Sequence, residues 1–231
     1  MFRILAFAAM LLVASLPVSA GLKEGVEAFK RGDYRTASRE FKALANQGHA
    51  EAQFHLGLMY YKGLRVPMNY ALAVNWLQNA AEQGDARAQF HLGLMYYKGL
   101  SVPKNYKLAV MWYRKAAEQG DASAQYKFGG MYFDGAGVPK NYREAAKWFR
   151  KAAEQGHAIT QYNLGVMYEN GGGVPHNYVL AYMWYSLAAA RGNKEAAKNV
   201  VLIVKHMAPA QVAKAQELAA KWRPKKAGST K

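Results

Sequence analysis

The chain contains no cysteine among its 231 residues. Disulfide bonds, thiolate metal clusters and the lipid-modified cysteine of a lipoprotein are therefore excluded. Small exported domains often depend on disulfides for their stability, but a chain of this length can bury enough apolar surface without them.

Long apolar runs are also scarce, and the most pronounced run lies at the amino terminus. Arg3 precedes the run Ile4–Leu16, which is 13 residues long, whereas a membrane-spanning helix needs about 20. A proline follows, and Val18-Ser19-Ala20 then supplies the small residues of a cleavage site. This order is typical of a secretory signal peptide. We expect residues 1–20 to be removed on export, so that the mature chain begins at Gly21 and has no transmembrane segment.

Motifs that carry catalysis are absent from the sequence. There is no Gly-x-Ser-x-Gly elbow, no phosphate-binding loop and no paired-carboxylate motif. The six histidines are the remaining candidates, and none has the spacing or the neighbouring ligands of a metal site. They are His49, His55, His91, His157, His176 and His206. We therefore expect a protein without enzymatic activity, cofactor or metal.

What the sequence does contain is a repeat with a constant spacing of 36 residues. The segment Gln53–Leu64 returns letter for letter at Gln89–Leu100, and returns in altered form at Gln125–Ala136 and Gln161–Gly172. A fixed period of this size is typical of a solenoid, in which each unit buries its apolar face against its neighbours.

Each repeat is expected to be a helical hairpin. In residues 50–85, apolar positions recur at helical spacing from Ala52, and Gly63 ends that first helix. The connection contains Pro67, Asn69 is placed to cap a second helix, and Gly84 ends it. The sequence thus predicts an all-α, right-handed α/α solenoid.

Small and aromatic residues return at fixed positions of the repeat. Glycine within a helix costs about 1 kcal/mol relative to alanine, so glycines at one constant phase predict two helix backbones in close approach. The aromatic positions could form a ligand-stacking ladder, but we interpret them as core. The positions are Gly57, Gly93, Gly129 and Gly165; Trp76, Trp112, Trp148 and Trp184; Tyr60, Tyr96, Tyr132 and Tyr168; and Tyr70, Tyr106, Tyr142 and Tyr178.

The pattern Ala-x-x-Ala-Gln-x-x-x-Gly-x-Met-Tyr-x-x-Gly, followed by Val-Pro-x-Asn-Tyr and Trp-x-x-x-Ala-Ala-x-x-Gly, resembles the Sel-one-like repeat family, a relative of the tetratricopeptide repeat. The resemblance divides the chain into a signal peptide, a shortened hairpin, four full repeats, closing helices and a basic tail. These segments are 1–20, 21–49, 50–85, 86–121, 122–157, 158–193, 194–222 and 223–231.

The resemblance implies a binding scaffold rather than an enzyme. Exported relatives assemble envelope complexes, modulate sensor kinases or cell-wall enzymes, or contact host proteins, so the expected partner is a protein or peptide. The expected location is the periplasm, with secretion as the alternative. Some cysteine-rich relatives have been linked to β-lactam binding or hydrolysis, but their disulfide-bearing repeats are missing here, and this function is the least favoured.

Two positions depart from the family pattern. Arg65 and Ser101 stand where the later loops have the second glycine of Gly-x-Gly-Val, so either their φ is negative or their loops are strained. Ala208 stands before Pro209 where a capping serine or threonine is expected, so the last helix should lack a side-chain N-cap.

Within the first helix of each repeat, several positions change from copy to copy. By resemblance to tetratricopeptide solenoids, the first helices line the concave surface, so these side chains are the candidate groove for a partner. The alternative for the aromatic ones is packing between repeats. The candidate residues are His55, Tyr61, Lys62, His91, Tyr97, Lys98, Lys127, Phe133, Asp134, Asn163 and Glu169.

The chain is strongly basic, with 31 Lys and Arg against 15 Asp and Glu and a net charge of +16. Counted from the sequence, residues 86–121 carry +4, residues 122–157 carry +3 and residues 194–231 carry +7. A cationic surface favours anionic partners. The alternative function is therefore attachment to an anionic envelope lipid or polymer, whereas nucleic acid is not expected for an exported protein. A solvated face that only keeps the protein soluble would need no partner at all.

Overall fold

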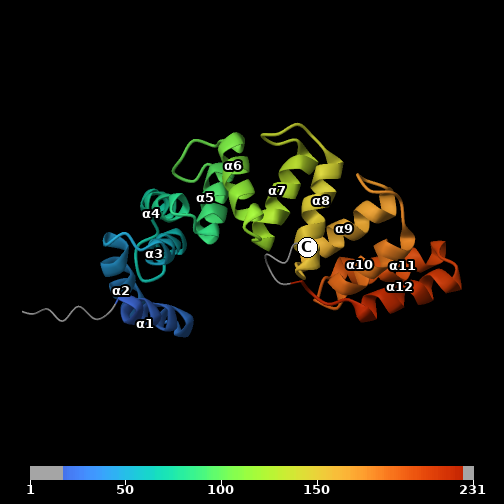
Figure 1. The fold of residues 1–231 in the computed structure, drawn as a ribbon, viewed down its shortest axis with the longest axis horizontal. Helices are drawn as coiled ribbons and strands as arrows, with labels where there is room; N and C mark the ends of the chain where they lie inside the picture. Colours follow the sequence, from blue (N-terminus) through green and yellow to red (C-terminus); the bar gives the residue numbers. More distant parts are fainter. Residues whose placement is uncertain (1–17, 226–231) are drawn as a thin grey trace, which may run out of the picture.

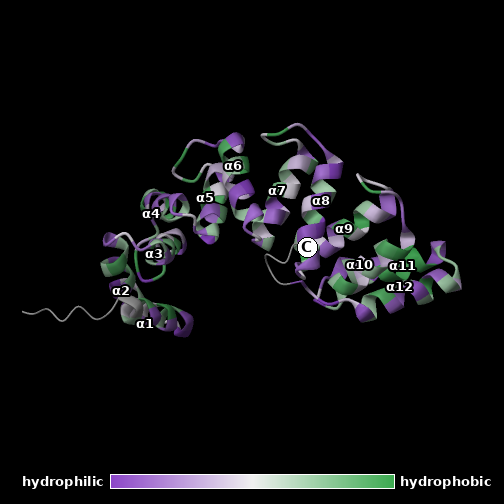
Figure 2. Cartoon of the chain, viewed as in Figure 1, coloured by the Kyte–Doolittle hydropathy of each residue, from purple (hydrophilic) through white to green (hydrophobic). Residues whose placement is uncertain are grey.

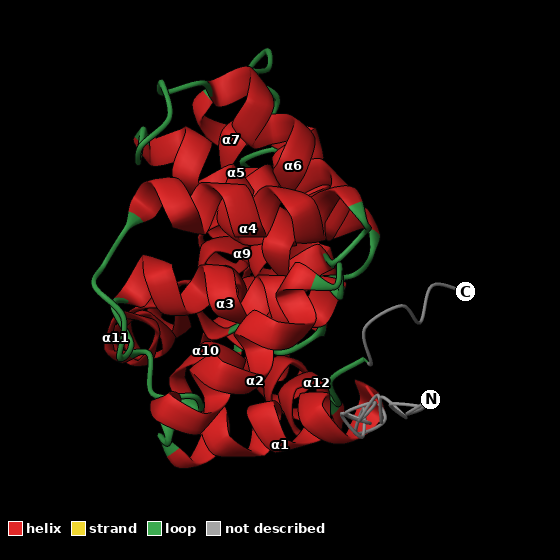
Figure 3. Ribbon diagram, turned by 90° about the vertical axis from the view of Figure 1, so that its left-hand side faces the viewer, coloured by secondary structure: helices red, strands yellow, loops and turns green. Residues whose placement is uncertain are grey.

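A computed structural model describes residues 18–225 as twelve α-helices and one short 3₁₀ helix, with no strand in that range (Figures 1 and 3). The apolar run of the predicted signal peptide lies outside the described residues. The helices are α1 (Val18–Arg31), α2 (Tyr34–Asn46), α3 (Ala50–Lys62), α4 (Tyr70–Glu82), α5 (Ala86–Lys98), α6 (Tyr106–Glu118), α7 (Ala122–Asp134), α8 (Tyr142–Glu154), α9 (Ala158–Asn170), α10 (Tyr178–Ala189), α11 (Lys194–Ile203), η1 (Val204–His206) and α12 (Pro209–Lys221).

Consecutive helices pair into hairpins that follow one another along an arch (Figure 1). Most helices carry both polar and apolar residues (Figure 2), as expected when a hairpin buries only one side against its neighbours, whereas α10 is almost wholly apolar. The predicted α/α solenoid with a 36-residue period is confirmed.

The sequence signals for helix ends work as expected. In α4, α6 and α10 the asparagine before the helix accepts a hydrogen bond from the third helical N–H, as Asn69 does from Leu72. Each first helix of a full repeat ends at a glycine in the left-handed conformation, for example Gly63 with φ 67°. His49 and His157 occupy N-cap positions, although neither side chain caps its helix by a hydrogen bond.

The repeated helical glycines make room for a side chain more than for a backbone. A Cβ on Gly93 would lie 2.8 Å from Cδ1 of Tyr113, and a Cβ on Gly129 would lie 2.6 Å from Cδ1 of Phe149. A large residue of the second helix fills the space above each glycine. The same position holds Leu77 in the first full repeat, and Gly25 faces Phe41 in the hairpin α1–α2. The backbone of the second helix is also close, since a Cβ on Gly57 would lie 3.2 Å from the Leu77 nitrogen and a Cβ on Gly129 3.2 Å from the Ala145 carbonyl oxygen, so the predicted close approach holds at these two positions.

A row of buried glutamines joins the hairpins. Gln89 donates from Nε2 to the carbonyl of Ala81, at the end of the preceding hairpin, and its Oε1 accepts from Gln119 of its own hairpin at 2.8 Å. The same bonds recur around Gln53 and Gln125. Gln161 keeps the bond to Ala153, but its Oε1 has no partner among the described residues.

The predicted aromatic core is confirmed for the tryptophans of the last three repeats, with Trp112, Trp148 and Trp184 all below one-tenth exposed. Trp76 is half-buried. The tyrosines that begin the second helices behave differently. Tyr106 is half-buried and Tyr142 is 41% exposed, and their rings pack against Tyr97 and Phe133 on the first helix of the same hairpin. These tyrosines therefore lie at the surface edge of each hairpin rather than in its core.

The departures in the loops prove to be strained. Arg65 has φ 59° and Ser101 has φ 53°, so both adopt the left-handed conformation that glycine has at positions 137 and 173. In the later loops the glycine is also required sterically, because a Cβ on Gly137 would lie 2.6 Å from the Tyr106 carbonyl oxygen.

Helices α11 and α12 close the carboxyl end, where α12 packs on α10. Ala208 has no side-chain cap, as predicted, but Gln211 accepts a hydrogen bond from the Ala208 N–H and so supplies half of a capping box. Beyond α12 the chain folds back: the Lys225 N–H donates to the Glu154 carbonyl, and Lys225 Nζ lies 2.8 Å from a carboxylate oxygen of Glu154. The start of the basic tail is thus docked on α8, whereas residues 226–231 lie outside the described part.

Candidate functional site

Two adjoining cavities open where the first helices of the second, third and fourth repeats meet. The larger, with a volume of about 350 Å³, lies between α7, α8 and α9 and is here called the apolar cavity. Its walls are mostly aromatic and aliphatic, and they are formed by Tyr126, Gly130, Phe133, Asp134, Phe149, Tyr162, Asn163, Val166 and Met167.

The smaller cavity, about 170 Å³, lies between α5, α6 and α7 and is here called the tyrosine cavity. It is lined by Tyr97, Tyr113, Tyr126, Lys127, Gly130, Met131 and Asp134. Both cavities share Tyr126, Gly130 and Asp134 of α7, so they adjoin at this helix. The two cavities together are here called the groove.

Gly130 accounts for the hollow at this place. The equivalent residues of the other repeats are Leu58, Leu94 and Val166. A Cβ on Gly130 would meet no atom within 4 Å, in contrast to the packed glycine at 129. The missing side chain therefore leaves open space in the middle of the groove.

Tyr113 forms part of the floor of the tyrosine cavity and carries an unsatisfied polar atom. Its side chain is 0% exposed, and its hydroxyl has no hydrogen-bond partner among the described residues. Burial raises the pKa of this phenol, so it stays protonated and can act as a donor. An unpaired buried hydroxyl costs about 1–3 kcal/mol.

The fourth repeat shows the same phenol with a partner. Tyr185, two repeats after Tyr113, donates from its hydroxyl to a carboxylate oxygen of Glu169, 2.5 Å away. The residue equivalent to Glu169 in the second repeat is Tyr97, which offers no carboxylate. The difference between the two repeats is therefore one missing acceptor.

The charged groups at the groove are of both signs. Lys127 Nζ lies 5.3 Å from the centre of the Tyr126 ring and is held over it by a cation–π contact. Asp134 is exposed and lines both cavities. The second and third repeats, which contribute α5 to α8, are nevertheless net positive, whereas the fourth repeat is neutral; the positive charge favours an anionic ligand over long range.

The structure brings together some of the residues predicted for the groove and separates others. Tyr97, Lys127, Phe133, Asp134 and Asn163 line the two cavities. Tyr61, Lys62, His91 and Lys98 lie on α3 and α5 and line neither of them. Glu169 lines neither cavity, and its carboxylate accepts a hydrogen bond from the Tyr185 hydroxyl.

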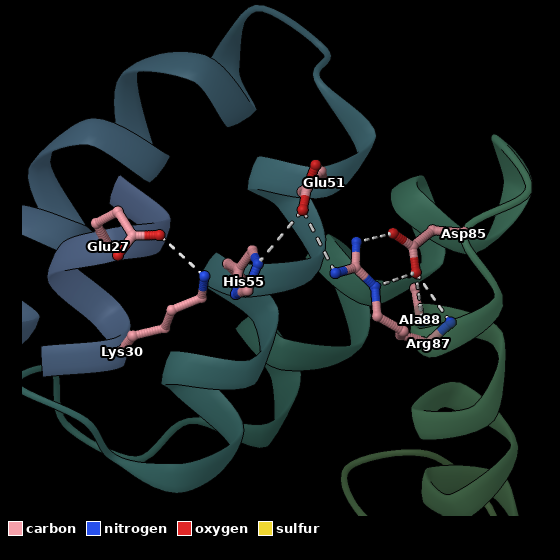
Figure 4. Close-up of polar contacts among 7 residues, drawn as sticks. All are labelled: Glu27, Lys30, Glu51, His55, Asp85, Arg87 and Ala88. Carbon is pink, nitrogen blue, oxygen red and sulfur yellow. Dashed lines mark hydrogen bonds and ion pairs between the residues drawn. The ribbon is translucent and has the colours of Figure 1, made fainter. Parts of the chain in front are cut away.

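His55 is a correction, because it is buried and so cannot form part of an exposed groove. Its ring stacks on Phe41 with centroids 4.6 Å apart, and the residue is 8% exposed. Glu51 lies between His55 and Arg87, with its Oε1 3.8 Å from His55 Nε2 and 3.4 Å from Arg87 Nη1 (Figure 4). Burial, and secondly the charge of Arg87, lower the pKa of His55 to about 4.

His91 is held in a similar way by aromatic neighbours. Its ring lies 5.7 Å from Tyr61 and 6.0 Å from Phe54. Burial, and secondly the charge of Lys62, lower its pKa to about 4. Both histidines are therefore neutral packing residues at pH 7.

Within residues 18–225, no three His, Asp or Glu side chains gather closely enough to hold a metal ion. The helices described there are also too short or too polar for any of them to cross a membrane.

The aromatic floor and walls of the groove were missed in the sequence. Tyr113 and Phe149 belong to the position that faces the repeated glycines, and Tyr126 and Tyr162 lie on the first helices. The sequence did contain a signal for them at the repeat position occupied by Leu77, Tyr113, Phe149 and Tyr185. Only the second and fourth copies carry a hydroxyl there.

Comparisons with known proteins agree with this architecture. The Sel1 repeat model matches four consecutive stretches of the chain, residues 50–85, 86–121, 122–157 and 158–193. The structure is similar to a Sel1 repeat protein from Oxalobacter formigenes, with a TM-score of 0.75 and 36% identity over 87% of this chain and 82% of that one.

Two further structures are similar over most of this chain. One is c5321, a protective antigen present in uropathogenic Escherichia coli strains displaying an SLR fold, with a TM-score of 0.58 and 30% identity over 89% of this chain and 53% of that one. The other, the immunity protein Pa5087 from Pseudomonas aeruginosa, shares the fold at 22% identity with a TM-score of 0.52, over 89% of this chain and 79% of that one. A comparison with curated proteins gave no match.

Proposed function

Because the chain belongs to the Sel1 repeat family, whose repeats commonly serve as scaffolds for protein interaction, we propose that it is an exported, non-enzymatic scaffold. It holds a segment of a partner protein in the groove formed by the apolar and tyrosine cavities. The observation that carries this proposal is the hollow at Gly130, bordered by the 41% exposed ring of Phe133. Exposed aromatic side chains beside an apolar recess are typical of binding hot spots.

The test is a pull-down from envelope extract with the mature chain as bait, using variants that change the groove. Gly130→Leu fills the hollow with the residue found at positions 58 and 94, and its Cβ would meet no atom within 4 Å. Phe133→Ala removes the exposed ring. Both should reduce the captured partner about tenfold. Gly130→Leu should not lower the melting temperature, and Phe133→Ala should lower it only slightly, because the exposed ring loses its contacts with Tyr142 and Phe149.

Met111→Ala is the matched control, because Met111 is 38% exposed on α6 and lines neither cavity. A partner captured equally by all three variants would show that the groove is not the binding surface.

Attachment by charge is the competing function, and salt separates it from recognition in the groove. Exposed charges are screened beyond about 8 Å at 0.15 M ionic strength. We expect capture to persist at that salt and after deletion of residues 223–231, since Lys225 already pairs with Glu154. Capture that disappears under both conditions and survives Gly130→Leu would instead support an anionic lipid or polymer as the partner.

Export is part of the same proposal, supported by the short apolar run and small residues before Gly21. Mass spectrometry of the protein recovered from the periplasm or medium should give a chain that begins at Gly21. Recovery of the chain only from the cytoplasm, with its first residues intact, would contradict export.

A further inference from the structure

We propose that the tyrosine cavity is a subsite for an acidic side chain of the partner, and that the apolar cavity receives an apolar side chain next to it in the partner's sequence. This inference rests on the proposed function, because it assigns chemistry to the same groove.

The first support is the unpaired hydroxyl of Tyr113. Buried polar groups in folded proteins nearly always have a hydrogen-bond partner, so one without a partner calls for an explanation. The tyrosine cavity that this side chain lines gives a place from which an acceptor can approach.

The second support is the bond that this protein makes in its own fourth repeat. There the equivalent phenol, Tyr185, donates to the carboxylate of Glu169. In the second repeat the hairpin has the same helices and the same glycine below the ring, but Tyr97 replaces the glutamate. A carboxylate from a partner would take the place that Glu169 has in the fourth repeat.

The third support is charge. Lys127 lines the tyrosine cavity and can turn from the Tyr126 ring toward a carboxylate. Hydrogen bonds to an ionised acceptor are about twice as strong as those between neutral groups. Because the Tyr113 hydroxyl is itself closed off from solvent, side chains that line the tyrosine cavity must shift as the ligand enters.

Asp134 should oppose binding of an acidic side chain, in contrast to Lys127, so its substitution predicts the direction of the change in affinity. Its carboxylate lies on the border of the two cavities, where it repels an acidic side chain. Asp134→Asn should therefore strengthen binding of an acidic ligand, whereas it would weaken binding of a basic one.

The apolar cavity determines what accompanies the carboxylate. It adjoins the tyrosine cavity across Gly130 and is walled by Phe133, Phe149, Tyr162, Val166 and Met167 together with polar groups at its edge. A leucine, methionine or phenylalanine side chain adjacent to the acidic residue fits a space of about 350 Å³.

The experiment is selection of a phage-displayed library of random twelve-residue peptides on the mature chain. The selected peptides are then made synthetically and their Kd is measured by fluorescence anisotropy against the variants. We expect enrichment of Asp or Glu beside a large apolar residue. Tyr113→Phe and Lys127→Gln should each weaken binding about tenfold, and Asp134→Asn should strengthen it severalfold.

Two comparisons serve as controls. Tyr185→Phe removes a phenol of the same kind from the fourth repeat. Its ring packs against Tyr162 but lines neither cavity, and because the ring itself is kept, Kd should change little. A peptide in which the acidic residue is replaced by its amide should bind the unmodified chain weakly and lose little more affinity on Tyr113→Phe.

The outcomes distinguish this inference from the proposed function. Peptides that lose binding on Gly130→Leu but not on Tyr113→Phe or Lys127→Gln would overturn the acidic subsite and leave the groove in place. Peptides insensitive to Gly130→Leu, or no enrichment over an unrelated protein, would overturn both.

Discussion

The ring of Tyr113 lies directly against Gly93, so that a methyl group on this glycine would come within 2.8 Å of the ring carbon Cδ1. The contact joins α5 to α6 and places the phenol at the floor of the tyrosine cavity. The same geometry, glycine below a large side chain, recurs at Gly57, Gly129 and Gly165.

Gly93→Ala should destabilise the protein, although alanine is the better helix former. The gain of about 1 kcal/mol in helix propensity is outweighed by overpacking of about 1–3 kcal/mol against the Tyr113 ring. Gly130→Ala is the matched control: it meets no neighbour within 4 Å and should stabilise by about 0.5–1 kcal/mol. Urea unfolding of both variants measures the difference, and equal effects on the free energy of unfolding would contradict it.

Arg65→Gly should raise the free energy of unfolding by about 1 kcal/mol, because it relieves a non-glycine residue at φ 59°. The gain is limited by the larger unfolded-state entropy of glycine. The reverse change in a later loop, Gly173→Ser, should be strongly destabilising, since a Cβ there would collide with the Tyr142 carbonyl oxygen. A thermal or chemical denaturation series that found Arg65→Gly less stable than the parent would count against strain in this loop.

Trp112→Ala should cost about 3–5 kcal/mol of stability, because the side chain is only 7% exposed and packs among apolar neighbours of two repeats. Tyr142→Ala provides the comparison within the aromatic set. With 41% of the residue exposed, its loss should cost much less. Similar losses for both residues in chemical denaturation would show that the two aromatic positions are equally part of the core.

Stability should fall as the pH is lowered from 7 to 5. The pKa of His55 and of His91 is about 4 in the folded protein, whereas the ordinary pKa of histidine is 6.5. Between pH 4 and pH 6.5 the unfolded chain therefore binds more protons than the folded protein. Protonation thus favours unfolding, by on the order of 2 kcal/mol per histidine at pH 5. Glu51 and Asp85 oppose this effect at His55, and Arg87 adds to it.

The matched variant for this pH effect is the double change His55→Asn and His91→Asn, since Asn163 already occupies the same repeat position in the fourth copy. Its free energy of unfolding should depend less on pH between 7 and 5 than that of the parent. An unchanged slope would show that other groups cause the loss.

The fold could be predicted from the sequence because its signals are local and repeated. Asn69 and its counterparts cap the second helices, and Gly63 and its counterparts end the first ones, so each hairpin was visible four times. The burial of the tryptophans could be predicted as well, because they recur at one fixed position of the repeat. Tyr142 was misjudged because a helical stripe alone does not show where the neighbouring hairpin ends.

The candidate site could be predicted only in part, since it depends on contacts between repeats. Phe133 and Lys127 were found because they vary among copies. His55 varies too, yet Phe41 from the shortened first hairpin covers it. The hydroxyl of Tyr113 lacks an acceptor because position 97 holds a tyrosine. This could be recognised only from the structure, in which the equivalent residues of the fourth repeat, Glu169 and Tyr185, form a hydrogen bond.

The buried glutamines set how the repeats unfold relative to one another. Gln53, Gln89 and Gln125 each bond both to the preceding hairpin and to the end of their own, so opening one interface leaves buried amide groups unpaired on either side. Such nearest-neighbour coupling favours a single cooperative transition over unfolding one repeat at a time. At Gln161 the row loses one bond, because Arg191 stands where the next glutamine would be. The next position that would bond back to the preceding hairpin holds Ala197 instead of glutamine. The weakest cooperative boundary should therefore lie between the fourth repeat and the closing helices, so fraying in hydrogen exchange would begin at α11 and α12 and leave the groove intact.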